Sequence, residues 1–227
     1  MKIAKQLLLC SVLLVACKAK TTNDNSQVDA TNDVLVTNEL KDVTKIDVSN
    51  IPSAIKPEGK PVIALKYYDK DGENYVIYSE ILIDHEGYEF APEGKLYYER
   101  FVNSGNGFNR VWKIYDYHEF CDFGGFIFGN FVDIQITDLD KDGYAEIWTM
   151  YETDCMGDVN PATVKLIAYN KDTKYAVRGT SKVRLEENGP TFGGEYKLGE
   201  GISGADKVFV DFAKQHFTKS VDSKINM

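Results

Sequence analysis

The chain has 227 residues, of which 43% are hydrophobic, and this length is sufficient for one domain with a full hydrophobic core. Its formal net charge of −9, with no basic stripe in the sequence, excludes nucleic acid as an expected partner. Fourteen Tyr, twelve Phe and two Trp, set in many short alternating runs, favour a mainly β fold.

The N-terminus has the pattern of a bacterial lipoprotein signal. Two lysines precede an apolar run over residues 7–15, and Ala16 stands directly before Cys17. The apolar run is too short to span a bilayer, and it ends in small residues, as a cleaved signal does. We therefore predict a signal peptide at residues 1–16 and a lipid anchor on Cys17, which would hold the chain on the periplasmic or cell-surface face of the outer membrane. An ordinary signal peptide with a coincidental cysteine is the alternative.

Residues 17–50 are polar and contain no aromatic side chain. Such a segment cannot bury enough apolar surface to offset its chain entropy. We predict the lipidated cysteine and a flexible tether over this range, and a coil of about 30 residues reaches roughly 30 Å. Residues 36–51 are the less certain part, since they have room for a short edge strand. A single globular β-rich domain is predicted over residues 51–220.

Short β-branched and aromatic runs follow one another through this domain. Asp-Gly and glycine-rich turns separate them, as is typical of β-hairpins. The pattern predicts an antiparallel sheet of about 8–10 strands. The runs lie at residues 61–68, 74–83, 95–103, 108–117, 131–137, 145–152, 163–169 and 175–183.

Near the C-terminus the hydrophobic period changes. Residues 188–204 are glycine-rich and predict a long loop, with room for a short strand near Tyr196. Residues 205–219 predict an amphipathic helix that packs on the sheet. The predicted fold class is therefore mainly β, of the α+β type. His216 is interpreted as part of the apolar face or its edge rather than as a ligand. The apolar residues at helical spacing are Val208, Phe209, Phe212, Ala213 and Phe217.

Aromatic residues of two neighbouring predicted strands are candidates for stacking on sugar rings. Side chains of this kind more often cover a core or its rim. The candidates are Tyr97, Tyr98, Trp112 and Tyr115.

The sequence ITDLDKDGYAEIW at residues 136–148 has the features of a calcium-binding turn. It offers four carboxylates and one backbone carbonyl at alternate positions, and Gly143 permits the sharp turn between them. Calcium takes about six to eight oxygen ligands of these kinds. Clustered carboxylates repel one another strongly without a cation. The predicted ligands are Asp138, Asp140, Asp142, the backbone of Tyr144, and Glu146.

The flanks of this turn read as strands, and Thr149 stands where an EF-hand requires its final glutamate. The turn is therefore similar to the single loops of FG-GAP or VCBS-type repeats. No acid, base or nucleophile accompanies it in the sequence, so we predict structural Ca²⁺ and no catalytic residue. A solvated acidic turn without an ion is the alternative. A second calcium loop at Asp69 and Asp71 is disfavoured because the closing carboxylates are missing.

Two cysteines, Cys121 and Cys155, remain once the signal and the anchor are set aside. In an exported protein they most plausibly form a disulfide, which would stabilise the fold by about 3–4 kcal/mol. In sequence they bracket the acidic turn. The alternative is a soft-metal or redox site that combines them with His118, although the irregular spacing falls short of a zinc signature.

Three segments are specific enough to compare with known families: residues 136–179, the run VWKIYD at 111–116 with the following Cys121, and the run KVFVDFAK at 207–214. They resemble a family of Bacteroidetes lipoproteins identified as surface polysaccharide (lipopolysaccharide) biosynthesis proteins. The resemblance covers most of residues 61–217 and not the tether. It implies a link to assembling or modifying the cell-surface glycan layer. It carries over no catalytic residue, only the aspartate turn and the two cysteines.

The sequence thus predicts a non-catalytic, calcium-braced lipoprotein that supports surface polysaccharide production by holding glycan or an envelope assembly protein. Enzymatic activity stays open. A carbohydrate-active hydrolase would need a cleft with two carboxyl groups about 5–9.5 Å apart. A glycan-binding or adhesive surface lipoprotein is a further alternative. Residues 153–161 are the first place to look for a functional surface.

Overall fold

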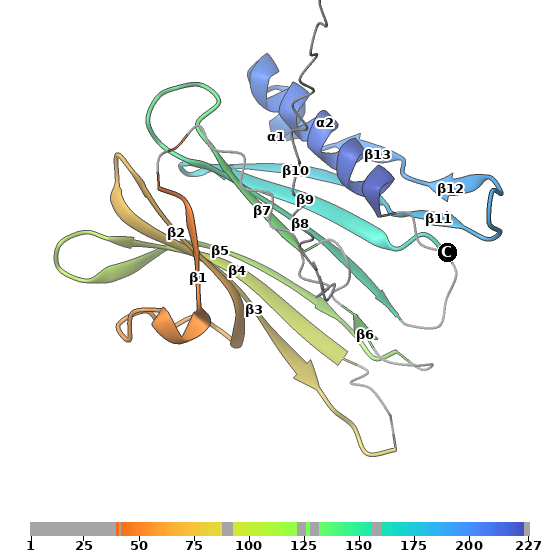
Figure 1. Ribbon diagram of the computed structural model, residues 1–227, viewed down its shortest axis with the longest axis horizontal. Helices are drawn as coiled ribbons and strands as arrows, with labels where there is room; N and C mark the ends of the chain where they lie inside the picture. Colours follow the sequence, from red (N-terminus) through yellow and green to blue (C-terminus); the bar gives the residue numbers. More distant parts are fainter. Residues whose placement is uncertain are drawn as a thin grey trace, which may run out of the picture. The chain divides into compact units, whose positions relative to one another are not determined.

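The computed structural model describes residues 40, 42–87, 93–121, 126–127, 132–155 and 160–224. The predicted signal peptide, Cys17 and the tether up to residue 39 lie outside these residues, as do residues 156–159. The described part contains 13 strands, two α-helices and one 3-10 helix (Figure 1). The predicted mainly β class with a C-terminal helix is confirmed, and its strands are divided between sheets.

The first sheet is antiparallel, with the strand order β1-β2-β3-β4-β5. The alternating runs of the sequence form its long strands. As predicted, an Asp-Gly turn joins β2 to β3 and a glycine-rich turn joins β4 to β5. Its strands are β1 (Thr44–Ile46), β2 (Lys60–Asp69), β3 (Gly72–Ile83), β4 (Glu93–Asn103) and β5 (Phe108–His118).

Strand β1 is the short edge strand for which residues 36–51 had room, and a 3-10 helix (Val48–Asn50) follows it. Ile51 and Ile55 then pack on the outer face of the first sheet against buried side chains such as Ile77. The folded domain therefore includes residues 44–50, which the sequence assigned to the tether. Apolar residues of this mostly polar segment, such as Ile46, pack against the outer face of the first sheet. Local composition does not reveal this contact.

The second sheet has the order β13-β10-β9-β8-β6, and β7 also pairs with β8. Two further strands, β11 and β12, form a separate two-stranded sheet. The strands are β6 (Phe126–Ile127), β7 (Asp133–Thr137), β8 (Glu146–Cys155), β9 (Thr163–Asn170), β10 (Thr173–Thr180), β11 (Lys182–Arg184), β12 (Thr191–Gly193) and β13 (Tyr196–Leu198).

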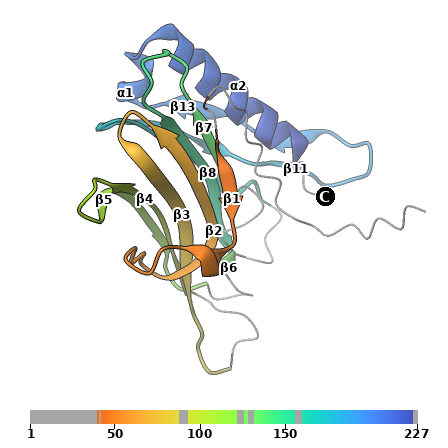
Figure 2. The same ribbon diagram turned by 60° about the vertical axis from the view of Figure 1, so that its left-hand side comes forward.

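The two large sheets pack face to face around the main core (Figures 1 and 2). The Tyr98 hydroxyl of the first sheet donates a hydrogen bond to the carbonyl of Met150 in the second, over 3.2 Å. The Trp112 ring stacks on Tyr169 with centroids 4.6 Å apart. The core contains residues of both sheets, among them Leu65, Val76, Ile114, Ile134, Ile147 and Ile167.

Helix α2 (Lys207–Ser223) covers the other face of the second sheet (Figure 1). Its buried residues Phe209, Ala213, Phe217 and Val221 recur every four positions, the spacing of one helix face. They contact a second core cluster that includes Trp148. The predicted helix and the short strand near Tyr196 are thus confirmed, and a short helix α1 (Glu200–Ser203) precedes α2. Within the described residues, no helix is long and apolar enough to cross a membrane.

Candidate metal site

The predicted metal turn, between β7 and β8, meets two other turns at one end of the domain. From the β2–β3 turn of the first sheet, the amide of Lys70 donates to the carbonyl of Gly143 over 2.9 Å. The Asp69 carboxylate accepts from the amide of Ala145 over 3.1 Å. From the β9–β10 turn, the Lys171 ammonium pairs with the carboxylate of Asp142. The acidic turn therefore connects both sheets.

Three of the predicted ligands converge within this turn. One carboxylate oxygen from each of Asp138, Asp140 and Glu146 lies within 4.8 Å of the others. Two oxygens bound to one Ca²⁺ at about 2.3–2.6 Å can be at most about 5 Å apart, so the cluster fits one ion. Asp138 also accepts from the amide of Gly143 over 3.2 Å and Asp140 from that of Asp142 over 3.1 Å, which wraps the backbone around the carboxylates.

Glu146 is the buried member of the cluster, with 1% of its surface exposed. It accepts from the Thr137 hydroxyl over 2.6 Å and from the Leu139 amide over 2.9 Å. Burial raises the pKa of the Glu146 carboxyl, the two hydrogen bonds oppose this rise, and the charges of Asp140 and Asp138 add to it. A divalent cation here would favour the ionised form and offset the repulsion within the cluster.

Asp142 lies differently from the other predicted ligands. Its carboxylate accepts from the amide of Tyr144 over 2.8 Å and pairs with Lys171, and it is not one of the three converging groups. The ammonium groups of Lys171 and Lys70 lie 4.5 Å and 5.4 Å from the centroid of the Tyr144 ring. Two cations therefore balance part of the charge on the outer side of the turn.

Asn170 is a further candidate ligand that sequence reasoning missed. It is paired with Glu146 across β8 and β9, so the two side chains lie on the same face of the sheet. The side-chain oxygen of Asn170 is buried and has no hydrogen-bond partner among the described residues. An amide oxygen is a common calcium ligand. Only the strand register reveals this proximity, because 24 positions separate the two residues in the sequence.

The other aspartate pair, which was weighed as a second calcium loop, has a different partner. The Arg100 guanidinium lies 3.4 Å from the Asp69 carboxylate and 2.6 Å from that of Asp71. The side chains of Arg100 and Asp69 are 3% and 0% exposed. This buried ion pair holds the β2–β3 turn in the orientation in which it contacts the metal turn.

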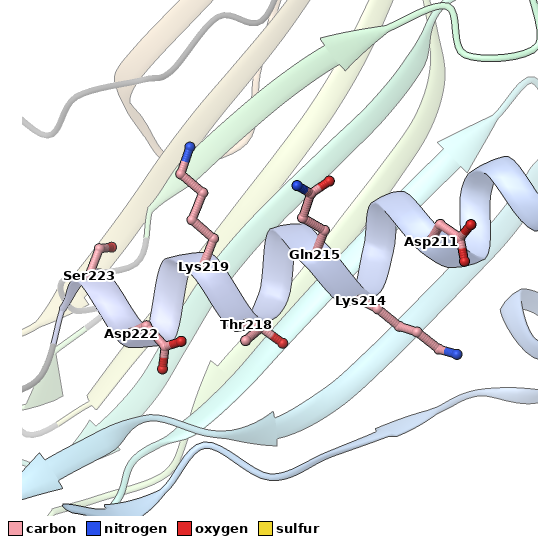
Figure 3. Close-up of a pocket in the computed structure, with 7 residues that line it drawn as sticks. All are labelled: Asp211, Lys214, Gln215, Thr218, Lys219, Asp222 and Ser223. Carbon is pink, nitrogen blue, oxygen red and sulfur yellow. The ribbon is translucent and has the colours of Figure 1, made fainter.

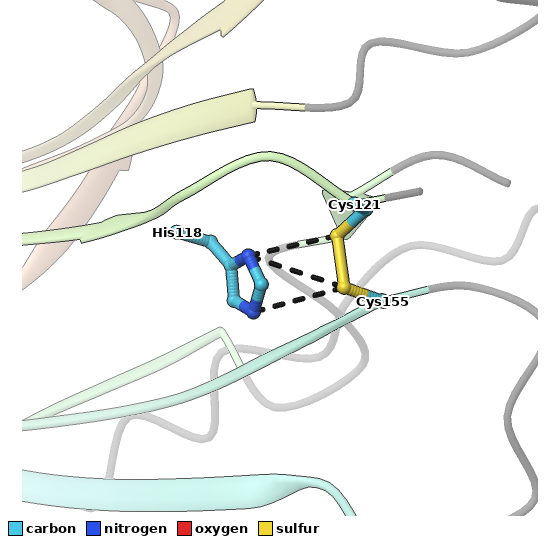
Figure 4. A group of neighbouring side chains, drawn as sticks. All are labelled: His118, Cys121 and Cys155. Atoms are coloured by element: carbon cyan, nitrogen blue, oxygen red, sulfur yellow. Dashed lines mark hydrogen bonds between the residues drawn. A yellow bond between two sulfur atoms is a disulfide. The ribbon is translucent and has the colours of Figure 1, made fainter. Parts of the chain in front are cut away.

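Cys121 and Cys155 form the predicted disulfide, with their sulfurs 2.11 Å apart (Figure 4). The bond brackets the acidic turn in sequence but not in space. Glu146 begins β8 and Cys155 ends it, and nine steps of about 3.3 Å place them roughly 30 Å apart. Of residues 153–161, the first three form the end of β8 that is far from the metal turn, and residues 156–159 lie outside the described part of the chain.

The candidate sugar-stacking residues separate into two groups. Tyr98 and Trp112 are buried between the sheets, the more common position for such residues, and are therefore not available for sugar stacking. Tyr97 and Tyr115 lie on the outer face, with ring centroids 5.3 Å apart. Tyr117, which the sequence did not single out, extends this row, with its ring centroid 5.8 Å from that of Tyr115. Tyr115 and Tyr117 are 47% and 51% exposed.

Helix α2 offers no comparable site. Its solvent-facing side chains line an open surface hollow that one helix forms alone (Figure 3). On its inner side, the Nε2 atom of His216 lies 3.2 Å from an oxygen of the buried Asp133, although not in a hydrogen-bonding direction. Burial lowers the pKa of Lys224, and the charges of Asp133 and Glu152 oppose this shift. The Asp133 and Glu152 carboxylates thus lie near the Lys224 ammonium.

Comparison of the chain with family models, with curated proteins and with solved structures returns no match.

Proposed function

We propose that the protein is a calcium-braced envelope lipoprotein that supports surface polysaccharide production without catalysing a reaction itself. The convergence of the Asp138, Asp140 and Glu146 carboxylates in one turn carries this proposal. Calcium bound there would offset the repulsion among these groups and fix the turn against which the other two turns pack. Its role is structural, because the neighbouring charged groups Asp69 and Lys171 form hydrogen bonds or ion pairs of the fold.

Thermal unfolding in calcium and in EDTA tests the metal site. A ligand that binds only the folded chain stabilises it by about 2.7 kcal/mol at a concentration of 100 times Kd. We expect a higher Tm in calcium for the wild type and for Asp172→Asn, which removes an exposed charge from a neighbouring turn. Asp140→Asn is expected to lose the calcium effect, because asparagine keeps the acceptor for the Asp142 amide and lacks the charge. An equal shift in Asp140→Asn would refute the site.

The row formed by Tyr97, Tyr115 and Tyr117 supports glycan as the molecule that the protein holds. The exposed rings of Tyr115 and Tyr117 offer apolar surface for the C–H faces of sugars, with hydroxyls at their tips for hydrogen bonding, while Tyr97, which is 6% exposed, packs against Tyr115. The lipid anchor proposed at Cys17 would keep the domain at the membrane near a growing polysaccharide. Palmitate labelling of the wild type, lost in Cys17→Ala, is the expected result for the anchor.

Deletion of the gene tests the polysaccharide role. We expect an altered lipopolysaccharide ladder, restored by the wild-type gene and not by Tyr115→Ala/Tyr117→Ala. An unchanged ladder after a clean deletion would remove the polysaccharide role and leave the calcium proposal standing.

A further inference from the structure

His118 lies against the disulfide at the far end of β8 (Figure 4). Its Nδ1 atom is 3.5 Å from the sulfur of Cys121, and its Nε2 atom is 3.7 Å from the sulfur of Cys155. The three side chains come from the end of β5, the residues just after it, and the end of β8. The sequence left two roles open for the cysteines, a disulfide or a soft-metal site with His118. In the structure the disulfide is formed, and the imidazole already lies beside it.

The imidazole has the orientation that metal-binding histidines use. Nδ1 lies 2.5 Å from the backbone carbonyl of Glu119, which suits an Nδ1–H donor and leaves the lone pair on Nε2. A hydrogen bond from the second ring nitrogen to a carbonyl commonly fixes the tautomer and the orientation of a ligand histidine. The ring nitrogen that carries the lone pair is the one beside Cys155.

The distances also suit a tetrahedral site. Ligands at about 2.3 Å for sulfur and 2.0–2.1 Å for nitrogen stand about 3.5 Å apart for an N–S pair and about 3.8 Å for an S–S pair. With Nε2 as the ligand, its distance of 3.7 Å to the Cys155 sulfur already matches the first value. One ligand atom from each of the three side chains lies within 4.8 Å of the others. The sulfurs must separate, and the Cys121 sulfur must move toward Nε2, because its 3.5 Å contact is with Nδ1. With the Cα atoms 5.7 Å apart, a χ1 rotation of Cys121 provides this movement.

We propose that reduction of the Cys121–Cys155 disulfide opens a binding site for a thiophilic divalent cation of the Zn²⁺ type, with His118, Cys121 and Cys155 as ligands. Cys155 is partly exposed whereas Cys121 is 1% exposed, so the thiolate of a dithiol reductant attacks the Cys155 sulfur. Cys121 leaves as a thiolate and takes a proton. The second thiol of the reductant then releases Cys155, and two electrons and two protons have been transferred. The cation displaces the thiol protons when it binds.

This site is independent of the proposed calcium turn. It uses nitrogen and sulfur, which zinc prefers, whereas the turn offers only oxygen. The two lie at opposite ends of β8, roughly 30 Å apart. Under oxidising conditions the two sulfurs would be bonded to each other in the disulfide and would therefore not be available as metal ligands.

Cobalt titration tests the proposal. The full chain carries Cys10→Ser and Cys17→Ser, so that Cys121 and Cys155 are its two cysteines. A phosphine reduces the disulfide, is converted to its oxide, and is removed under anaerobic conditions before Co²⁺ is added. We expect one equivalent to give a thiolate-to-cobalt charge-transfer band and visible d–d bands in the reduced chain and no charge-transfer band in the oxidised chain.

Variants identify the ligands. His118→Ala is expected to weaken Co²⁺ binding by about tenfold or more, because even loss of a group that only orients a metal ligand costs about 10–100-fold. His85→Ala and Asp140→Asn should bind like the reduced parent, the second separating this site from the acidic turn. No charge-transfer band in the reduced chain, an unchanged affinity in His118→Ala, or loss of near-UV circular dichroism on reduction would each overturn the proposal.

Discussion

The backbone amide of Lys70 donates a hydrogen bond to the carbonyl of Gly143 over 2.9 Å, and this bond ties a turn of the first sheet to the acidic turn of the second. The backbone at Gly143 has a φ of +81°, which glycine adopts without strain. A Cβ atom built there would lie 2.7 Å from the Cε atom of Lys70. The closeness of the two turns therefore depends on a glycine at this position.

We predict that Gly143→Ala lowers the free energy of unfolding by about 1–3 kcal/mol, because alanine is strained at this φ and the Lys70 side chain must move. It should also weaken calcium binding, because the ligands flank the glycine. Gly105→Ala is the matched control, since its φ is +84° and nothing lies within 4 Å of the added Cβ atom. Urea unfolding and calcium titration check both effects. Equal calcium affinity in the two variants would contradict the coupling.

Removal of Arg100 should disrupt the same junction from the side of the first sheet. Its guanidinium and the Asp69 carboxylate are both buried, so Arg100→Ala leaves an unpaired buried charge and should cost about 3–5 kcal/mol. Lys207→Ala removes an exposed pair with Asp211 and should change stability by less than about 0.5 kcal/mol. Denaturant midpoints measure both changes. A cost for Arg100→Ala as small as that of the control would show that the pair does not support the junction.

If the tyrosine row binds glycan, substitutions in it should lower the affinity for glycan without lowering the stability of the fold. Replacing Tyr115 or Tyr117 by alanine should weaken binding to the purified surface polysaccharide by about two- to tenfold, the effect of one aromatic contact. Both side chains are about half exposed, so the thermal stability should stay close to that of the wild type. Tyr68→Ala is the control, an equally exposed tyrosine three strands away. Affinity electrophoresis in the polysaccharide would reveal the difference, and equal retardation of all variants would argue against the row.

Local pattern was sufficient to predict the longer strands and the helix. It missed the short strands β6 and β12, and it joined β10 and β11, which belong to different sheets, in one run at residues 175–183. The runs expected at residues 61–68 and 74–83 correspond to β2 and β3, and the helical spacing from residue 205 corresponds to α2. The exposed face of each strand was harder to predict from the sequence. The first sheet is covered on both faces, by the second sheet on one side and partly by residues near Ile51 and Ile55 on the other, so alternation alone could not separate the buried Tyr98 and Trp112 from the exposed Tyr115.

The convergence of three carboxylates in the acidic turn could be predicted from the sequence, but the surroundings of the turn could not. Asp138, Asp140 and Glu146 are close in sequence, and their convergence follows from one tight turn. The contacts of Asp142 with Lys171 and of Gly143 with Lys70 join positions 29 and 73 residues apart, which only the packing of sheets brings together. The length of β8 likewise separates the disulfide from the turn that it brackets in sequence.

Calcium titration of the full chain by isothermal calorimetry tests the central claim most directly. The chain is first freed of metal with EDTA and then exchanged into EDTA-free buffer. We predict saturable heat with one Ca²⁺ per chain and a much weaker response to Mg²⁺, which demands a tighter octahedral shell. The heat should be absent in Asp138→Asn/Asp140→Asn, which keeps the backbone hydrogen bonds of the turn. No calcium heat from the folded wild-type chain at any accessible concentration would contradict the account.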